Sequence, residues 1–220
     1  MLKLSPITSG LELQLLGALP IDPADLREID ALWQQALAGR PTLFDGPMLT
    51  VREIAPDRLL LAEISYRHVV AAQASAAIRE RLGLRGLAVS GILNCPDGLV
   101  FGRRGGMVTS GTGRWELVPS GGVTPPKPDL ARQVLLELEE EIGLSAAQVR
   151  VAAPVALIEQ PGLLDVALPL STDLSASEIK SLHRDRGSAE YDELFIGDLP
   201  NGELVPESRA IIEAGLAKKQ

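Results

Sequence analysis

The chain has 220 residues, of which 45% are hydrophobic, enough for a sizeable core in one large domain or in a core domain with an extension. Its formal net charge of −8 opposes general binding to nucleic acid or to an anionic membrane, since both need a basic face. Cys95 is the single cysteine, which excludes an internal disulfide framework and indicates a reducing compartment. The sequence shows neither a basic, apolar leader nor about 18 consecutive apolar residues, and so predicts a cytoplasmic protein without a membrane segment.

The first 84 residues predict an α+β unit. Loose alternation of apolar and polar residues indicates one or two strands within residues 2–19. Asp22 and Pro23 are typical of a helix start, and Gly39 and Gly83 are typical of helix ends. The remaining expected elements are a helix over residues 23–39, strands over 48–54 and 58–65, and a helix through 69–82.

The rest of the chain, residues 85–220, predicts a second unit in which strands alternate with a few helices. A Pro-Asp-Gly turn indicates a hairpin between its first two strands. Strands mixed with segregated helices favour an α/β sandwich. The expected strands cover residues 87–93, 99–102, 115–118, 149–159, 163–170 and 190–197, and the expected helices cover 128–143, 174–182 and 206–216.

The helix over residues 128–143 carries four glutamates near its C-terminal end. At about 100° per residue, Glu137, Glu140 and Glu141 share an arc beside the apolar stripe, whereas Glu139 points elsewhere. Like charges at these spacings cost roughly a few tenths of a kcal/mol per pair, and no lysine lies within the helix. A divalent cation would reverse that repulsion, because carboxylate oxygens are the ligands that Mg²⁺ prefers. The alternative is an ordinary solvated acidic face.

The segment from residue 122 to residue 144 resembles the Nudix box, the pattern G-x5-E-x7-R-E-U-x-E-E-x-G-U in which U is aliphatic. Gly122 matches the first glycine, and residues 137–144 match the end of the pattern. Two positions depart from it, because Pro128 stands at the first glutamate and Leu136 stands at the arginine. In the family those two side chains brace the loop against the helix. Their joint absence leaves no orphaned charge, but it puts metal affinity and turnover in question.

The resemblance implies a Nudix-like α/β/α sandwich with a mixed sheet over residues 85–220, with residues 1–84 as an N-terminal α+β extension. It implies a hydrolase that cleaves a nucleoside diphosphate linked to another moiety X, giving a nucleoside monophosphate and X-phosphate. The implied cofactor is Mg²⁺, with Mn²⁺ as an alternative, held by Glu137, Glu140 and Glu141. Glu137 would also orient or deprotonate water. The partner would be a small nucleoside diphosphate derivative and neither nucleic acid nor membrane.

Four residues are candidates for substrate binding. Arg103 and Arg104 end a predicted strand one loop before the box, and guanidinium groups suit bidentate contacts with phosphate. An ordinary solvated loop is the alternative. Gly121 and Gly122 form the Gly-Gly turn that leads into the loop of the box, and they complete the expected substrate-binding set.

A further acidic candidate follows the box. Glu190 and Glu193 resemble an acidic stretch that in many Nudix enzymes supplies another metal ligand or a base. Strand register decides which of the two faces the metal, and Glu190 is taken as the catalytic candidate. The alternative is that both are ordinary charged residues at the start of a strand, without a role in the site.

The N-terminal runs PTLFDGPMLTVREI and LLLAEISYRHVVAA resemble the extension of a Nudix subgroup that hydrolyses UDP-glucose. This resemblance predicts a UDP-sugar substrate such as UDP-glucose, cleaved to UMP and sugar 1-phosphate. ADP-ribose or a dinucleotide is the nearest enzymatic alternative. A Nudix-like module that binds nucleotide without cleaving it is the alternative from another class. The N-terminal region would cap the active site or form the interface of a homodimer.

Overall fold

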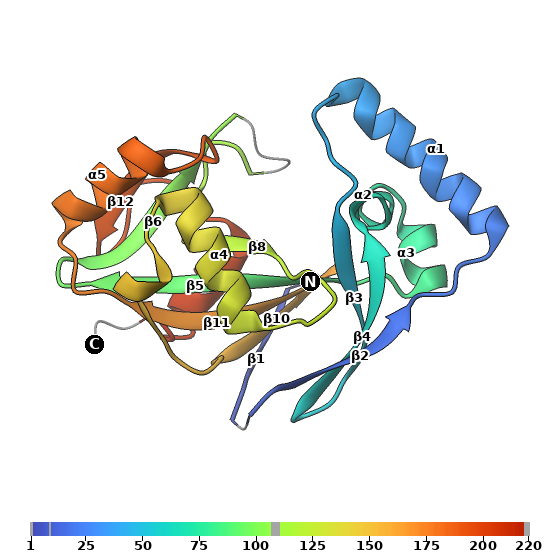
Figure 1. The fold of residues 1–220 in the computed structure, drawn as a ribbon, viewed down its shortest axis with the longest axis horizontal. Coiled ribbons are helices and arrows are strands. Elements are labelled where there is room, and N and C mark those ends of the chain that lie inside the picture. The colour runs from blue at the N-terminus through green and yellow to red at the C-terminus, as the bar shows by residue number, and fades with distance from the viewer. Residues whose placement is uncertain (1, 9, 107–110, 218–220) are drawn as a thin grey trace.

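The computed structural model describes residues 2–8, 10–106 and 111–217. Its described strands belong to one twelve-stranded sheet, in which β1, β10, β11, β5, β3, β4 and β2 are neighbours in that order (Figure 1). The strands are β1 (Lys3–Pro6), β2 (Glu12–Ala18), β3 (Pro47–Ile54), β4 (Arg58–Ser65), β5 (Gly86–Cys95), β6 (Gly98–Arg104), β7 (Trp115–Leu117), β8 (Ser120–Gly122), β9 (Arg150–Val151), β10 (Ala156–Gln160), β11 (Leu163–Ser171) and β12 (Tyr191–Gly197). The helices are α1 (Pro23–Gly39), α2 (Tyr66–Ala74), α3 (Ala76–Leu82), α4 (Leu130–Ile142), α5 (Ala176–Arg186) and α6 (Pro206–Glu213), with a 3₁₀ turn η1 (Ala146–Gln148).

Strand β5 organises the sheet, because it is parallel to β11 and antiparallel to β3, β6 and β8. Nearly all of its residues are buried, since helices cover both faces of the sheet around it. Leu87, Val89 and Leu93 pack with α4 and α5, whereas Ile92 packs with α6 on the opposite face. The expected α/β sandwich with a mixed sheet is confirmed.

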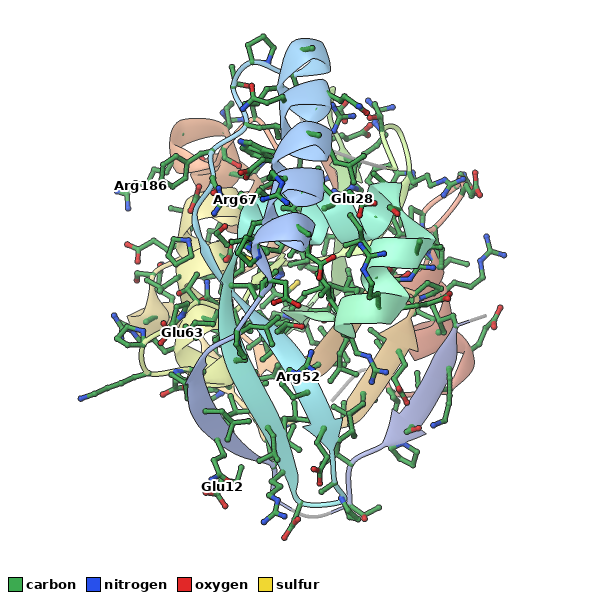
Figure 2. The ribbon with its side chains drawn as sticks, turned by 90° about the vertical axis from the view of Figure 1, so that its right-hand side faces the viewer. Glu12, Glu28, Arg52, Glu63, Arg67 and Arg186 are labelled. Atoms are coloured by element: carbon green, nitrogen blue, oxygen red, sulfur yellow. The ribbon has the colours of Figure 1, made fainter. Side chains whose placement is uncertain are left out.

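The N-terminal elements form a continuation of the same sheet, with α1, α2 and α3 on one face. Figure 2 shows the charged side chains around these helices, Glu28 and Arg67 among them. Thr50 on β3 pairs with Gly86 on β5, and its Oγ1 accepts a hydrogen bond of 2.9 Å from the backbone N of Arg85. Strand β1 lies at the far edge of the sheet, paired with β10. The division at residue 84 stays a prediction.

Three local elements differ from the expectation. The helix predicted through residues 69–82 is two helices, because Ser75 ends α2 and its Oγ caps α3 by accepting a hydrogen bond of 3.3 Å from the N of Ile78. The strand predicted over residues 149–159 is interrupted after β9, where Pro154 has no N–H to donate. The Gly-Gly turn is the short strand β8, paired with β5. Within the described ranges, no helix combines the length and the apolar character needed to cross a bilayer.

Candidate active site

Helix α4 has well-defined ends. Asp129 is its N-cap, with Oδ1 accepting a hydrogen bond of 3.0 Å from the backbone N of Arg132. Gly143 follows its last turn at φ 82°, a left-handed conformation that suits glycine. The buried residues of the helix are Leu130, Val134, Leu138, Glu141 and Ile142. This apolar face fixes the rotation of the helix on the sheet, and therefore the directions of its glutamates.

The Glu137 carboxyl group lies between α4 and β8. Its Oε1 accepts a hydrogen bond of 2.7 Å from Nε2 of Gln133. A side chain at Gly121 would overlap this carboxyl group, so glycine at that position allows β8 to lie directly against it. Burial raises the pKa of Glu137 to about 7, the Gln133 hydrogen bond opposes the shift, and the charges of Glu140 and Glu190 add to it. This carboxyl group therefore titrates near neutral pH.

Glu141 is the most deeply buried glutamate of the helix, with an exposed fraction of 2%. Its Oε2 accepts hydrogen bonds from the backbone N of Ser120 at 3.1 Å and from the Tyr191 hydroxyl at 3.2 Å. Its Oε1 is buried and has no hydrogen-bond partner. Burial raises the pKa of Glu141 well above its ordinary value, and the charges of Glu190, Glu116 and Glu137 raise it further. The unpartnered oxygen is a costly feature that an apolar core would not retain.

Arg104 links Glu190, just before β12, with Glu116 on β7, and both lie near enough to Glu141 of α4 for their charges to raise its pKa. Arg104 Nη1 donates to Glu116 Oε1, and its Nη2 lies 4.0 Å from Glu190 Oε1. Burial raises the pKa of Glu190, Arg104 opposes that shift, and the charge of Glu140 adds to it. Glu140 itself is exposed. We call Glu116, Glu137, Glu140, Glu141 and Glu190 the acidic cluster.

Arg103 and Glu193 lie away from this cluster. The Nε of Arg103 donates to Asp192 Oδ1 at 2.8 Å, its Nη2 lies 3.3 Å from Glu193 Oε2, and its guanidinium stacks 6.0 Å from the Trp115 ring centroid. Successive side chains of a strand point to opposite faces of the sheet, so the Arg103 and Arg104 side chains lie on opposite faces. Glu190, and not Glu193, therefore lies near the glutamates of α4.

The acidic cluster is not preformed as a cation site. Among the described residues, no group of three or more His, Cys, Asp or Glu side chains is arranged to hold a metal ion. The donor chemistry nevertheless fits a hard divalent cation, because carboxylates predominate and the buried Oε1 of Glu141 lacks a partner.

Comparisons with known proteins rest on structure alone, because no family model and no curated protein matches the sequence. The chain is structurally similar to Nudix hydrolases. The MutT protein of Methanosarcina mazei Go1 is 21% identical, with 58% of this chain and 90% of that chain covered and a TM-score of 0.44. The M. smegmatis Nudix hydrolase RenU is 16% identical, with 59% and 82% covered and a TM-score of 0.47. DR0079 of Deinococcus radiodurans is 17% identical, with 79% and 93% covered and a TM-score of 0.46.

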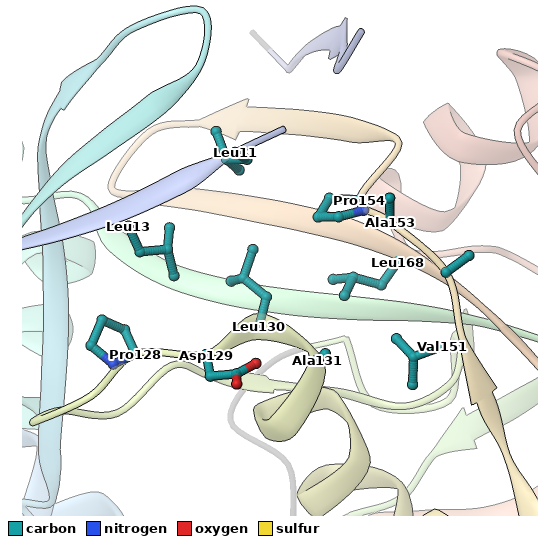
Figure 3. A pocket seen from close by; sticks show the side chains of 11 residues that line it. Leu11, Leu13, Pro128, Asp129, Leu130, Ala131, Val151, Ala153, Pro154 and Leu168 are labelled. Carbon is teal, nitrogen blue, oxygen red and sulfur yellow. The ribbon is translucent and has the colours of Figure 1, made fainter. Parts of the chain in front are cut away.

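A separate apolar pocket of about 410 Å³ lies at the N-terminal end of α4 (Figure 3). Leu11 and Leu13 line one side of it, Val151 and Leu168 line another, and Leu130 lines the pocket from the first turn of the helix. No member of the acidic cluster contributes to its wall. Its lining offers few groups to a charged diphosphate, so the pocket and the acidic cluster are distinct sites.

Three neighbours of the expected residues were not identified from the sequence. Glu116 belongs to the strand that precedes the box, and Tyr191 follows Glu190 directly, but neither stands at a position of the box. Gln133 lies one helical turn before Glu137, a spacing at which side chains meet on a helix. This four-residue spacing was the one feature of the sequence that could have predicted the contact between Gln133 and Glu137.

Proposed function

We propose that this chain is a Nudix hydrolase, a Mg²⁺-dependent pyrophosphohydrolase that acts on a nucleoside diphosphate linked to another moiety. The observation that carries the proposal is the buried Glu141 carboxyl group, whose Oε1 has no partner and which lies near enough to Glu137 and Glu190 for their charges to raise its pKa. Two of these glutamates stand at box positions, and the third comes from a distant part of the sequence. Perturbed carboxyl groups gathered in this way are typical of functional sites.

The reaction adds water across a phosphoanhydride. A bond forms between the water oxygen and one phosphorus atom, the bridging P–O bond breaks, and the products are a nucleoside monophosphate and X-phosphate. Mg²⁺ held by Glu137, Glu140 and Glu141 would neutralise charge on the phosphoryl oxygens. Glu137 would also orient the attacking water and accept its proton as a general base. Arg104, which is largely buried between Glu116 and Glu190, contributes positive charge within the cluster, where it would attract the diphosphate.

The preferred substrate in this proposal is a UDP-sugar such as UDP-glucose, giving UMP and sugar 1-phosphate. Its support is the resemblance of residues 41–54 and 59–72 to the extension of a UDP-glucose-hydrolysing subgroup. That extension lies close to the box in space, because a Cβ on Gly122 would lie 2.6 Å from Cε of Met48 on β3. ADP-ribose and dinucleotides remain the enzymatic alternatives.

A binding module that does not hydrolyse its nucleotide is the alternative from another class. The departures at Pro128 and Leu136 favour it, since the family's brace between loop and helix is missing. The acidic cluster favours catalysis, because a module that only binds nucleotide gains nothing from burying mutually repulsive carboxyl groups.

Turnover of a defined panel tests the proposal. The chain would be incubated with UDP-glucose, ADP-ribose and a diadenosine polyphosphate, with Mg²⁺ and with EDTA, and the products would be followed by ³¹P NMR. We expect UDP-glucose to give UMP and glucose 1-phosphate only when Mg²⁺ is present. Hydrolysis of ADP-ribose alone would replace the UDP-sugar assignment while retaining the reaction type.

Matched variants locate the activity. Glu140→Gln should reduce turnover at least about a hundredfold without unfolding the chain, because it removes one of the charges proposed to hold the cation. Glu139→Gln, on the neighbouring exposed position, is the control and should retain full activity. Full activity in Glu140→Gln, or no turnover of any compound by the unmodified chain, would contradict the proposal.

A further inference from the structure

A chain of two hydrogen bonds runs from the loop before α4 to Glu137. The hydroxyl of Thr124 donates to Oε1 of Gln133 over 3.2 Å. The amide Nε2 of Gln133 donates to Oε1 of Glu137 over 2.7 Å. Gln133 is half-buried, and its backbone N donates to the carbonyl of Asp129 over 2.9 Å, so α4 fixes its position. Both ends of one amide side chain are thus engaged.

The amide suits this place because it is both a donor and an acceptor without being charged. A glutamate here would repel Glu137, since residues four apart on a helix are neighbours. A lysine would pair with the carboxylate and compete with a cation for it. Glutamine restrains the Glu137 carboxyl group while leaving its negative charge available.

The loop over residues 123–129 needs such a restraint. Pro128 and Leu136 cannot form an ion pair between loop and helix, and the Leu136 side chain is largely exposed. The hydrogen bond from Thr124 to Gln133 instead connects this loop to α4. Because the same amide contacts Glu137, fixing the loop and orienting the carboxylate depend on a single residue.

We propose that Gln133 is a positioning residue, which fixes the loop over residues 123–129 on α4 and holds the Glu137 carboxyl group in the acidic cluster. The part that concerns catalysis rests on the proposed function. The part that concerns the loop does not, because it follows from the contacts of Thr124 and Gln133 alone. The two parts therefore receive separate measurements.

The first measurement addresses Glu137. Gln133→Met keeps the length of the side chain but removes both hydrogen bonds. We expect the affinity for Mn²⁺, measured by electron paramagnetic resonance without substrate, to fall about tenfold or more. The kcat for the nucleotide substrate should fall by a similar factor while KM changes less than about twofold, because Gln133 would not touch substrate. Unchanged Mn²⁺ affinity together with unchanged kcat would overturn the positioning role.

The second measurement addresses the loop, by hydrogen exchange of its four backbone amides in the metal-free chain, those of Val123, Thr124, Lys127 and Asp129, because the other three loop residues are prolines. Thr124→Val and Thr124→Ser form a matched pair, because only serine keeps the hydroxyl. We expect faster exchange in Gln133→Met and Thr124→Val and near-normal exchange in Thr124→Ser. Unchanged exchange in Gln133→Met would overturn the restraint on the loop. Faster exchange in a chain that binds no Mn²⁺ would support that restraint while contradicting the proposed function.

Discussion

At the scale of single residues, the buried carboxyl groups are the feature that packing alone does not explain. Burial raises the pKa of Glu137, Glu141 and Asp165, which means that each ionised carboxylate lowers the stability of the fold. Glu137 and Glu141 belong to the acidic cluster, where a cation would offset that cost. Asp165 on β11 lies outside the cluster and serves as a comparison.

Replacing Glu141 should separate stability from function. Glu141→Gln keeps an oxygen that can accept from Ser120 and Tyr191 but removes the buried charge. We expect the free energy of unfolding in EDTA at neutral pH to rise, measured by urea denaturation, while turnover is lost. The exposed control Glu139→Gln should change it by less than about 0.5 kcal/mol. A destabilised Glu141→Gln would show that the carboxylate supports the fold and not the reaction.

Asp165 predicts a pH dependence of stability. Burial raises its pKa from 3.8 to about 7, the Ser90 hydrogen bond opposes that shift, and the charges of Glu207 and Glu116 add to it. A folded pKa above the unfolded value gives stability that is fully present below pH 3.8 and is lost as pH rises to about 7. The loss attributable to Asp165 should reach up to about 4 kcal/mol.

Asp165→Asn isolates that contribution, because asparagine keeps an acceptor for the Ser90 hydroxyl. Urea unfolding of both chains between pH 4.5 and 8 should show a difference that grows up to about pH 7 and is then constant. The variant should be the more stable chain at pH 8. A difference that does not change across this range would contradict the raised pKa.

At the scale of elements, the site depends on how closely β8 approaches α4. The sequence predicted α4 well, because Asp129, Gly143 and the apolar period each carry a local signal. It did not predict β8, because Ser120, Gly121 and Gly122 have no strand periodicity and their conformation comes from pairing with β5. The break at Ser75 was missed for a similar reason, since the apolar pattern continues across it.

Helical periodicity also placed Glu141 at the edge of the apolar stripe, whereas the structure buries it. The backbone N of Ser188 donates to the carbonyl of Glu140, and a Cβ at Gly187 would lie 2.7 Å from the carbonyl of Glu141, so the segment before β12 covers this turn of the helix. Such cover comes from residues more than 40 positions away and has no signal within the helix. The burial of Glu141 could therefore be seen only in the tertiary structure.

Gly121→Ala tests the contact between β8 and the helix. The added methyl group would overlap the Glu137 carboxyl group, which must then rotate out of the cluster. We expect kcat to fall about a hundredfold while the far-ultraviolet circular dichroism spectrum is preserved, because a displacement of about 1 Å is enough for such a loss. Gly106→Ala is the matched control, since a Cβ there meets open space. Equal kcat in the two variants would show that β8 does not constrain Glu137.

At the scale of the whole molecule, the N-terminal strands β3 and β4 share a hydrophobic core with the rest of the chain, whereas α1, α2 and α3 contribute to a separate buried cluster. Leu49 and Leu61, from β3 and β4, belong to the same buried cluster as Val134 and Leu138 of α4. The sequence indicated a division at residue 84, because Arg85 onward resembles the first strand of the Nudix-like core. It could not indicate that β3 pairs with β5, because strand pairing between distant segments has no local signal.

This shared core predicts cooperative unfolding. Trp33 lies in α1 and Trp115 lies in β7, so each part of the chain carries its own fluorescent probe. In the single-tryptophan variants Trp33→Phe and Trp115→Phe, urea unfolding should give equal slopes of free energy against urea concentration. Each midpoint should agree with the midpoint that circular dichroism gives for the same variant. Fluorescence transitions that precede or follow the circular dichroism transition would mean that residues 1–84 unfold separately from the rest.

A crystal soaked with Mn²⁺ would show whether the acidic cluster holds a divalent cation. We expect an anomalous scattering peak in contact with the Glu141 carboxyl group and with at least one of Glu137 and Glu140, and no such peak in Glu141→Gln. A peak elsewhere on the molecule, or none at all, would contradict this expectation.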